Sequence, residues 1–173
     1  MTKQRLAIVA IMTAILLSAC TATPQKPNAS LTIPDENPVY PINPVRREKI
    51  DIRVEVSFAF DEAELRPEEK KRLDEIFGKL RDAHIEFIMA IGHTDQTGHD
   101  QYNENLSRDR AHAVRKYLVS ILHNLDPDRI GIEGAGKNDS ATGKKCVSIP
   151  NRKEKIECYQ PDRRVTLHII GFY

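Results

Sequence analysis

The chain lacks an excess of charge of either sign. Its 173 residues carry 26 Lys and Arg against 25 Asp and Glu, a formal net charge of +1. Binding to nucleic acid needs a basic face that displaces condensed counterions, so this balance argues against a nucleic-acid partner. A long apolar run is also missing. The run at residues 6–17 has about 12 residues and is too short to cross a bilayer as a permanent helix.

The sequence also has few of the groupings that mark an enzyme or a metal centre. Its three cysteines form no Cys-x-x-Cys pair, and no His-x-x-His accompanies them. A metal site built on Cys146 and Cys158 is therefore disfavoured. Ser107 has no implied His–acid relay that would make it a nucleophile, and a hydrolase would need paired carboxylates or a metal set. We expect a protein without enzymatic activity, metal or cofactor.

The N-terminus has the pattern of an export signal. Two basic residues precede the apolar run, and the small residues before Cys20 suit a processing point. With Cys20 directly after them, the segment resembles a bacterial lipobox. This predicts a signal peptide over residues 1–19, cleavage before Cys20 and lipid on that cysteine; an ordinary signal peptide is the alternative. Thr21 is not Asp, which in Gram-negative lipoproteins favours sorting to the outer membrane.

The remaining cysteines, Cys146 and Cys158, are left as a pair if Cys20 carries lipid. An oxidising periplasm permits a disulfide between them. The loop that it closes is short, so the chain-entropy model gives a stabilisation of roughly 3 kcal/mol.

The segment after the lipidated cysteine is rich in proline. Residues 20–49 hold six of the ten prolines and show no apolar period. This composition predicts an extended tether, which at about 3.1 Å per residue would reach on the order of 90 Å. A disordered leader without a spacing role is the alternative interpretation.

The rest of the chain, residues 50–173, is predicted to form one domain. Strict alternation predicts a strand over 50–60, and Pro67 begins a helix that runs to about residue 80. A second strand spans 84–91, with Ile85, Phe87, Met89 and Ile91 on one face. A helix over 101–123, a strand over 129–134, a polar loop and a strand over 163–170 follow. The predicted fold is α/β, a two-layer sandwich with two helices on one face of a mixed four-stranded sheet.

An acid and an arginine are placed at one loop–helix junction. Asp95 comes just after the second strand, and Arg110 lies on the core-facing stripe of the next helix, four residues from Leu106. A buried guanidinium needs a partner, and Asp95 is the obvious candidate. The pair could be a salt bridge that only pins the loop. Alternatively, it could grip a ligand that carries both an amine and a carboxylate.

Several separated motifs resemble one family. FAFDEAEL, IGHTDQTGHDQYNENLSRDRA, RIGIEGAGK and PDRRVTLHI occur in order over about residues 50–170 and are similar to the OmpA-like C-terminal domain. This family binds peptidoglycan without cleaving it. The cysteine-bearing loop before PDRRV resembles the enterobacterial branch. His93, Asp95 and His99 together also fit the donor types of a zinc site, but the GHTD motif accounts for His93 without a metal.

The resemblance implies a ligand and a set of binding residues. In the family, the Asp of GHTD and the Arg of RA hold the diaminopimelate of the stem peptide, which corresponds to Asp95 and Arg110 here. Asp95 would accept from the ammonium, and Arg110 would grip the carboxylate with two parallel bonds. Arg163 would support the pocket or only tie the last strand, and the second role is favoured. Four further residues match positions that line the pocket: Asp61, Thr94, Asn103 and Leu106.

Two functions follow as expectations. The first is an outer-membrane lipoprotein, facing the periplasm, that binds peptidoglycan and links membrane to wall. The alternative is a wall-anchored adaptor in a secretion, conjugation or motor complex, in which envelope proteins are partners. The stiff, apolar stretch of residues 38–44 would suit docking on such a partner.

Overall fold

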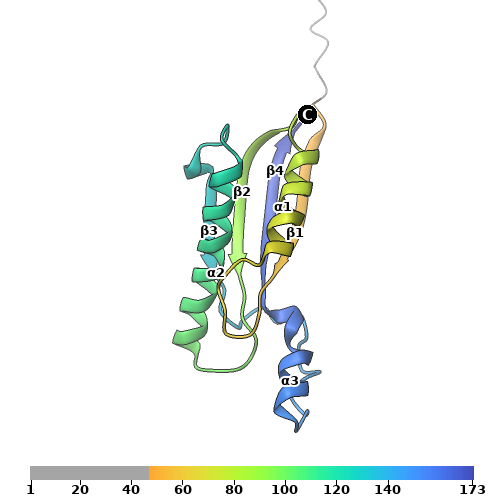
Figure 1. Cartoon of the computed structure of the whole chain (residues 1–173), viewed down its shortest axis with the longest axis vertical. Helices are drawn as coiled ribbons and strands as arrows, with labels where there is room; N and C mark the ends of the chain where they lie inside the picture. Colours follow the sequence, from red (N-terminus) through yellow and green to blue (C-terminus); the bar gives the residue numbers. More distant parts are fainter. Residues whose placement is uncertain (1–46) are drawn as a thin grey trace, which may run out of the picture. The chain divides into compact units, whose positions relative to one another are not determined.

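The computed structural model describes residues 47–173. The predicted signal peptide, Cys20 and most of the predicted tether lie outside these residues. The described part contains four strands, three α-helices and two 3-10 turns (Figure 1): β1 (Lys49–Ser57), α1 (Pro67–Lys79), β2 (His84–Gly92), α2 (Asp100–Ile121), η1 (Pro127–Arg129), β3 (Ile130–Gly134), α3 (Arg152–Cys158), η2 (Gln160–Asp162) and β4 (Arg164–Phe172).

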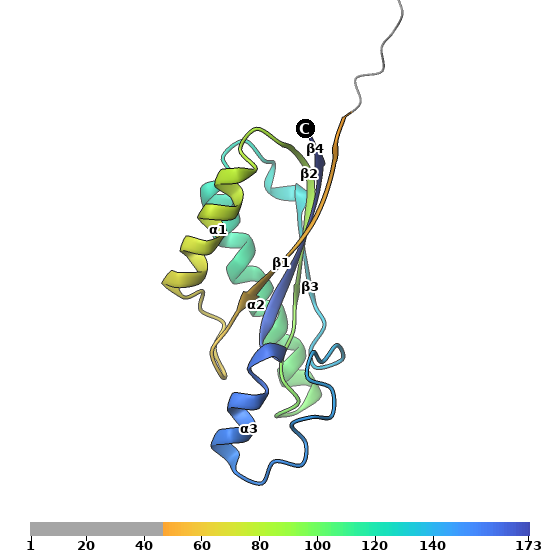
Figure 2. The same ribbon diagram turned by 90° about the vertical axis from the view of Figure 1, so that its right-hand side faces the viewer.

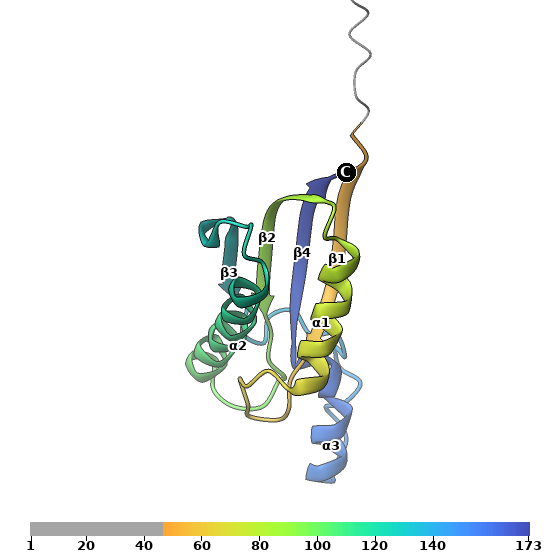
Figure 3. The ribbon, with the colours of Figure 1, turned by 45° about the horizontal axis from the view of Figure 1, so that its top comes forward.

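The strands form one mixed sheet with the order β1-β4-β2-β3. β4 runs antiparallel to both β1 and β2, whereas β2 and β3 are parallel. Helices α1 and α2 cover one face of the sheet (Figures 2 and 3). The α/β class, the two layers and the two covering helices of the predicted fold are therefore confirmed.

The core lies between that face and the two helices. β1 alternates as its sequence predicts, with Val54 and Val56 buried and the odd-numbered residues pointing away. Leu73 of α1 and Leu118 of α2 are fully buried over the sheet. Pro67 occupies the first turn of α1, where it sacrifices no intrahelical hydrogen bond. The described residues include no helix with the length and apolar character needed to span a membrane.

Strand β2 departs from its expected pattern. Its helix-covered face carries Ile88 and Ala90, both 0% exposed, while Phe87 is 36% exposed. Ile88 lies opposite Ile169 in the register with β4, and the register shifts between Ile85 and Phe87. Because the odd-numbered residues from 85 to 91 are all apolar and the even-numbered set contains His84 and Glu86, a period of two finds the strand but favours the face that is not buried from residue 87 onward.

The segment between β3 and β4 is more ordered than the predicted polar loop. It contains α3, whose preceding residue Asn151 accepts hydrogen bonds from the backbone N–H of Lys153 and Glu154. The predicted disulfide between Cys146 and Cys158 is confirmed, with their Cα atoms 5.8 Å apart. This bond fastens the end of α3 to the preceding loop, called below the disulfide loop (residues 137–160).

Two glycines let α2 approach the sheet closely. A Cβ on Gly92 would overlap the carbonyl oxygen of Ser107, and one on Gly134 would lie 2.7 Å from the Ser107 hydroxyl. That hydroxyl donates to Glu104 O at 2.8 Å and accepts from Gly136 N at 3.0 Å. Ser107 is thus occupied in joining helix to sheet, and the first turns of α2 are held near the carboxyl end of β2.

Candidate functional site

All seven predicted binding residues line one cavity of about 280 Å³. It lies where the carboxyl end of β2 meets the start of α2, at the end of the domain opposite the C-terminus (Figure 1). The β1–α1 loop, the β2–α2 loop, α2, α3 and the residue just before β4 all contribute to it. Its lining consists of Phe60, Asp61, Thr94, Asp95, Thr97, Gly98, Tyr102, Asn103, Leu106, Arg110, Arg152 and Arg163.

Asp95 is 4% exposed and is held from two sides. Its Oδ1 accepts from the backbone N–H of Thr97 at 2.9 Å and from the Thr97 hydroxyl. Its Oδ2 accepts from Nη1 of Arg163 at 3.1 Å. A carboxylate offers roughly four lone-pair sites, so Asp95 keeps capacity for one further donor.

Arg110 is 0% exposed, and its partners are backbone carbonyls. It donates to Glu62 O and His93 O, each at 2.8 Å, and to Ala59 O at 3.1 Å. Within residues 47–173 it makes no direct hydrogen bond or ion pair with Asp95, so the expected Asp95–Arg110 pairing is wrong. Three carbonyls bind the guanidinium instead, and they tie both the β1–α1 loop and the β2–α2 loop to α2. Further N–H groups beyond these three remain on Arg110.

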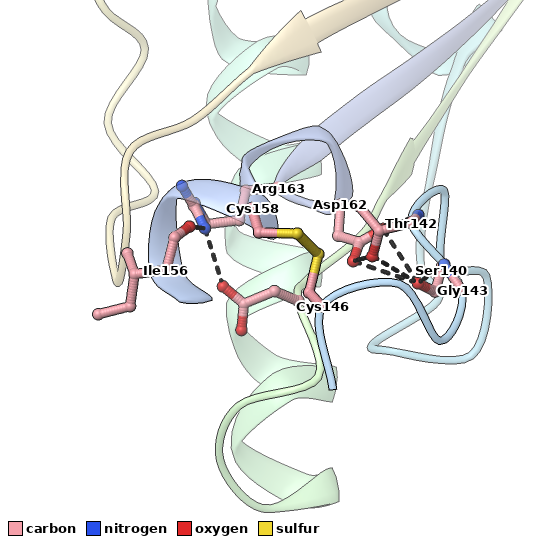
Figure 4. The surroundings of a disulfide bond; sticks show 9 residues. Ser140, Thr142, Gly143, Cys146, Ile156, Cys158, Asp162 and Arg163 are labelled. Atoms are coloured by element: carbon pink, nitrogen blue, oxygen red, sulfur yellow. Dashed lines mark hydrogen bonds and ion pairs between the residues drawn. A yellow bond between two sulfur atoms is a disulfide. The ribbon is translucent and has the colours of Figure 1, made fainter. Parts of the chain in front are cut away.

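Arg163 takes the place that was expected of Arg110. It is 5% exposed, and its Nη1 bonds both Asp95 and the carbonyl of Ile156 in α3, the latter at 2.9 Å. Its guanidinium carbon lies 5.9 Å from the centroid of the Phe60 ring. Figure 4 shows Arg163 beside Ile156 and Cys158 of the disulfide loop. The sequence favours a structural role for Arg163 in tying the last strand. The structure shows that it also connects the disulfide loop to Asp95.

Two exposed residues of the cavity lining are joined by a hydrogen bond. The hydroxyl of Tyr102, on α2, donates to Oδ1 of Asp61, which belongs to the β1–α1 loop. This hydrogen bond raises the pKa of Tyr102 above its ordinary value. Asp61 has a φ of 62°, a conformation that Asp adopts more readily than most residues. Asn103, also on α2, donates to Thr97 O at 2.8 Å and so ties the helix to the β2–α2 loop.

The interior of the cavity combines charge with unsatisfied polar atoms. Burial, followed by the nearby Arg163, lowers the pKa of Arg110 to about 10, and Asp95 partly opposes this change. Arg110 therefore stays protonated at neutral pH. Within residues 47–173, Thr94 Oγ1 and Arg163 Nε are buried without a hydrogen-bond partner. Buried polar groups are nearly always paired, so these two atoms are suited to a ligand.

His93 contributes to the site through its backbone carbonyl, and it does not line the cavity. It is 3% exposed, its carbonyl accepts from Arg110, and its ring lies 3.6 Å from the carboxylate of Asp139. Burial, with a smaller contribution from Arg164, lowers its pKa to about 4. Among residues 47–173, no cluster of three or more His, Cys, Asp or Glu side chains is arranged to hold a metal ion.

A larger hollow of about 790 Å³ lies at the other end of the helices. The last residues of α1 and α2 line it, and none of the predicted residues do. Its size alone gives it no chemistry, whereas the smaller cavity combines buried charges with polar atoms that lack partners. We therefore take the smaller cavity as the candidate site.

Five of the lining residues were not predicted to form the site: Phe60, Thr97, Gly98, Tyr102 and Arg152. Thr97 carries a readable signal, because Asp-x-Thr is a pattern in which the Asp side chain caps the backbone two residues on. Arg152 carries none. It reaches the cavity only through the path of the disulfide loop, which the sequence pattern does not determine.

Comparison with known proteins agrees with the motifs. The OmpA family model matches residues 57–153. Outer membrane protein P5 of Haemophilus influenzae is 34% identical over 134 residues, which are 78% of this chain and 37% of that protein. Outer membrane protein A of Shigella flexneri is 33% identical over 76% of this chain and 38% of its own length. The chain thus spans less than two fifths of these relatives.

Solved structures give the same fold. The OmpA-like domain of FopA1 from Francisella tularensis superposes with a TM-score of 0.55 and 27% identity, over 73% of this chain and 77% of that one. The cell wall anchor of the T6SS from Pseudomonas aeruginosa gives 0.53 and 21% identity, over 72% and 82%. The second likeness concerns the fold alone. The family match, the relatives and the shared architecture together show that this chain belongs to the OmpA family.

Proposed function

We propose that the domain binds peptidoglycan non-covalently, through the diaminopimelate of the stem peptide, and that it catalyses no reaction. The observation that carries this proposal is the single cavity in which Asp95, Arg110 and Arg163 meet. The side-chain end of diaminopimelate has an ammonium and a carboxylate on one carbon. A site for it needs one acid and at least one guanidinium within a few ångströms of each other.

The contacts within the cavity support distinct roles for these groups. Asp95 is oriented by Thr97 and Arg163, and its spare lone pair suits the ligand ammonium. The remaining N–H groups of Arg110 suit the ligand carboxylate. The partnerless hydroxyl of Thr94 and Nε of Arg163 supply further polar contacts. No group in this arrangement needs to exchange a proton, which fits a binding site better than a catalytic one.

Burial of the charges sets a condition on binding. Arg110 is 0% exposed and Asp95 is 4% exposed, so contact with a ligand requires lining side chains to move. The Asp61–Tyr102 hydrogen bond joins two exposed side chains of the lining. Exposed hydrogen bonds are weak net of water, so little free energy opposes the loss of this one. We propose that the bond breaks when the stem peptide enters.

We further propose that the chain is a lipoprotein of the outer membrane, with lipid on Cys20 and the domain in the periplasm. The support is the N-terminal sequence: the basic start, the short apolar run, the lipobox-like residues before Cys20, and Thr21. The names of the relatives place those proteins in the outer membrane. The disulfide fits an oxidising compartment. The chain would then link membrane to wall, with avidity over many copies.

Cosedimentation of the whole chain with purified diaminopimelate-type peptidoglycan tests the binding proposal. Asp95→Asn removes the charge proposed to face the ammonium, and Asp109→Asn is the matched control, an exposed aspartate of α2 that does not line the cavity. We expect parent and control to pellet with the polymer and Asp95→Asn to stay soluble, with circular dichroism showing that all three are folded. Equal pelleting of all three would remove Asp95 from the site.

A further inference from the structure

The candidate cavity holds more positive charge than diaminopimelate alone requires. Its lining contains three arginines, Arg110, Arg152 and Arg163, and two aspartates, Asp61 and Asp95. The side-chain end of diaminopimelate is itself neutral, with one ammonium and one carboxylate. One positive charge of the lining is therefore left over for another anionic group of the ligand.

Arg152 is the arginine available for that group. Arg110 donates to three backbone carbonyls, and Arg163 bonds Asp95 and Ile156. Arg152, by contrast, is exposed and forms no side-chain hydrogen bond or ion pair with any residue from 47 to 173. It lies on the cavity wall with its guanidinium uncommitted.

The position of Arg152 is fixed by the disulfide loop. Asn151 accepts from the two backbone N–H groups that follow Arg152. The Cys146–Cys158 bond holds the far end of α3, and the Ile156 carbonyl ties the helix to Arg163. On the other side of the disulfide, the buried carboxylate of Asp162 accepts from Thr142 N at 2.9 Å (Figure 4). An arginine whose backbone is held in this way loses less backbone freedom on binding than one on a loose loop.

We propose that Arg152 is a specificity-determining residue that binds a second carboxylate of the stem peptide, outside the diaminopimelate side chain. This inference rests on the proposed function. Two groups of a stem tetrapeptide have the required chemistry: the free α-carboxylate of the γ-linked glutamate next to diaminopimelate, and the C-terminal carboxylate. Amidation of either group removes its charge with little change in shape.

Titration calorimetry of the whole chain with four synthetic tetrapeptides tests this proposal. One tetrapeptide is unmodified, one is amidated at glutamate, one is amidated at the C-terminus, and one is amidated at both. Parent, Arg152→Gln and Lys153→Gln are compared. Lys153 is the matched control because it is the neighbouring exposed cation on α3 and does not line the cavity.

We expect Arg152→Gln to weaken binding of the unmodified tetrapeptide roughly three- to tenfold, the range of a partly exposed charged hydrogen bond. Lys153→Gln should match the parent. One amidation should weaken the parent by the same factor and leave Arg152→Gln unaffected, and that amidation identifies the carboxylate. The doubly amidated peptide should bind parent and Arg152→Gln equally.

Two results would overturn the proposal. The first is an Arg152→Gln protein that binds the unmodified tetrapeptide as the parent does. The second is an Arg152→Gln protein that loses affinity equally for all four peptides, because Arg152 would then act on the whole site. A parent that binds none of the four peptides contradicts the proposed function itself, and so is distinguishable from both results.

Discussion

Replacement of Arg110 should damage the fold as well as the site. Its guanidinium is 0% exposed and donates to the carbonyls of Ala59, Glu62 and His93. Arg110→Met keeps much of the side-chain volume and removes all three donors. The substitution therefore isolates the hydrogen bonds from the effect of a cavity.

The magnitude follows from how deeply each carbonyl is buried. The bond to His93 O is buried, and the loss of its donor costs about 1–3 kcal/mol. The bonds to Glu62 O and Ala59 O are only partly buried, so water can replace part of each, at roughly 0.5–1 kcal/mol apiece. The expected loss is about 3 kcal/mol, which lowers the melting temperature by on the order of 10 °C in a domain of this size.

Urea unfolding followed by circular dichroism measures this loss. Arg108→Met is the control, since Arg108 lies on the same helix and forms only an exposed pair with Glu104; its change should stay within about 0.5 kcal/mol. If Arg110→Met unfolds within about 1 kcal/mol of the parent, the three carbonyl bonds do not hold the two loops to α2 and this reasoning is refuted. A large loss means that reduced binding by an Arg110 variant cannot be attributed to ligand contact alone.

Three further predictions concern fold, pH and redox state. Gly134→Ala should cost about 1–3 kcal/mol in urea unfolding, because its Cβ would lie 2.7 Å from the Ser107 hydroxyl; an unchanged midpoint would show that α2 can move away freely. The pKa of His93 falls from 6.5 to about 4 on folding, so the unfolded chain binds more protons between these values and stability should fall as pH drops. From pH 6.5 to 5 the loss is at most about 2 kcal/mol, and His93→Gln should reduce this slope; an equal slope in both proteins would contradict the assignment. Reduction of Cys146–Cys158 should release α3 and weaken tetrapeptide binding about as much as Arg152→Gln does, whereas unchanged affinity in dithiothreitol would show that α3 keeps its place without the bond.

The sequence predicts the fold well where local signals are strong. Pro67 marks the start of α1, the alternation in β1 separates inward from outward residues, and the spacing of Leu106, Arg110 and Val114 places the arginine on the inner face of α2. These features depend on neighbours within a few residues, which a sequence pattern records directly.

Features that depend on distant residues were not predictable in the same way. The apolar odd-numbered residues of β2 favour the wrong inward face, because the register shift between Ile85 and Phe87 does not show in a period of two. The partner of Asp95 was misassigned because Arg163 lies 68 residues away and reaches the acid only through the arrangement of β4. Arg152 enters the cavity through the path of the disulfide loop. Each case needed the tertiary structure.

The most direct test of the central claim uses two stem tetrapeptides that differ at one residue, diaminopimelate in one and lysine in the other. Lysine keeps the ammonium and lacks the carboxylate. Because only the peptide changes, the protein and its fold are the same in both titrations. We predict that the whole chain binds the diaminopimelate peptide at least roughly tenfold more tightly, the value of one charged bidentate contact. Equal affinity for the two peptides would contradict recognition of diaminopimelate in the cavity of Asp95 and Arg110.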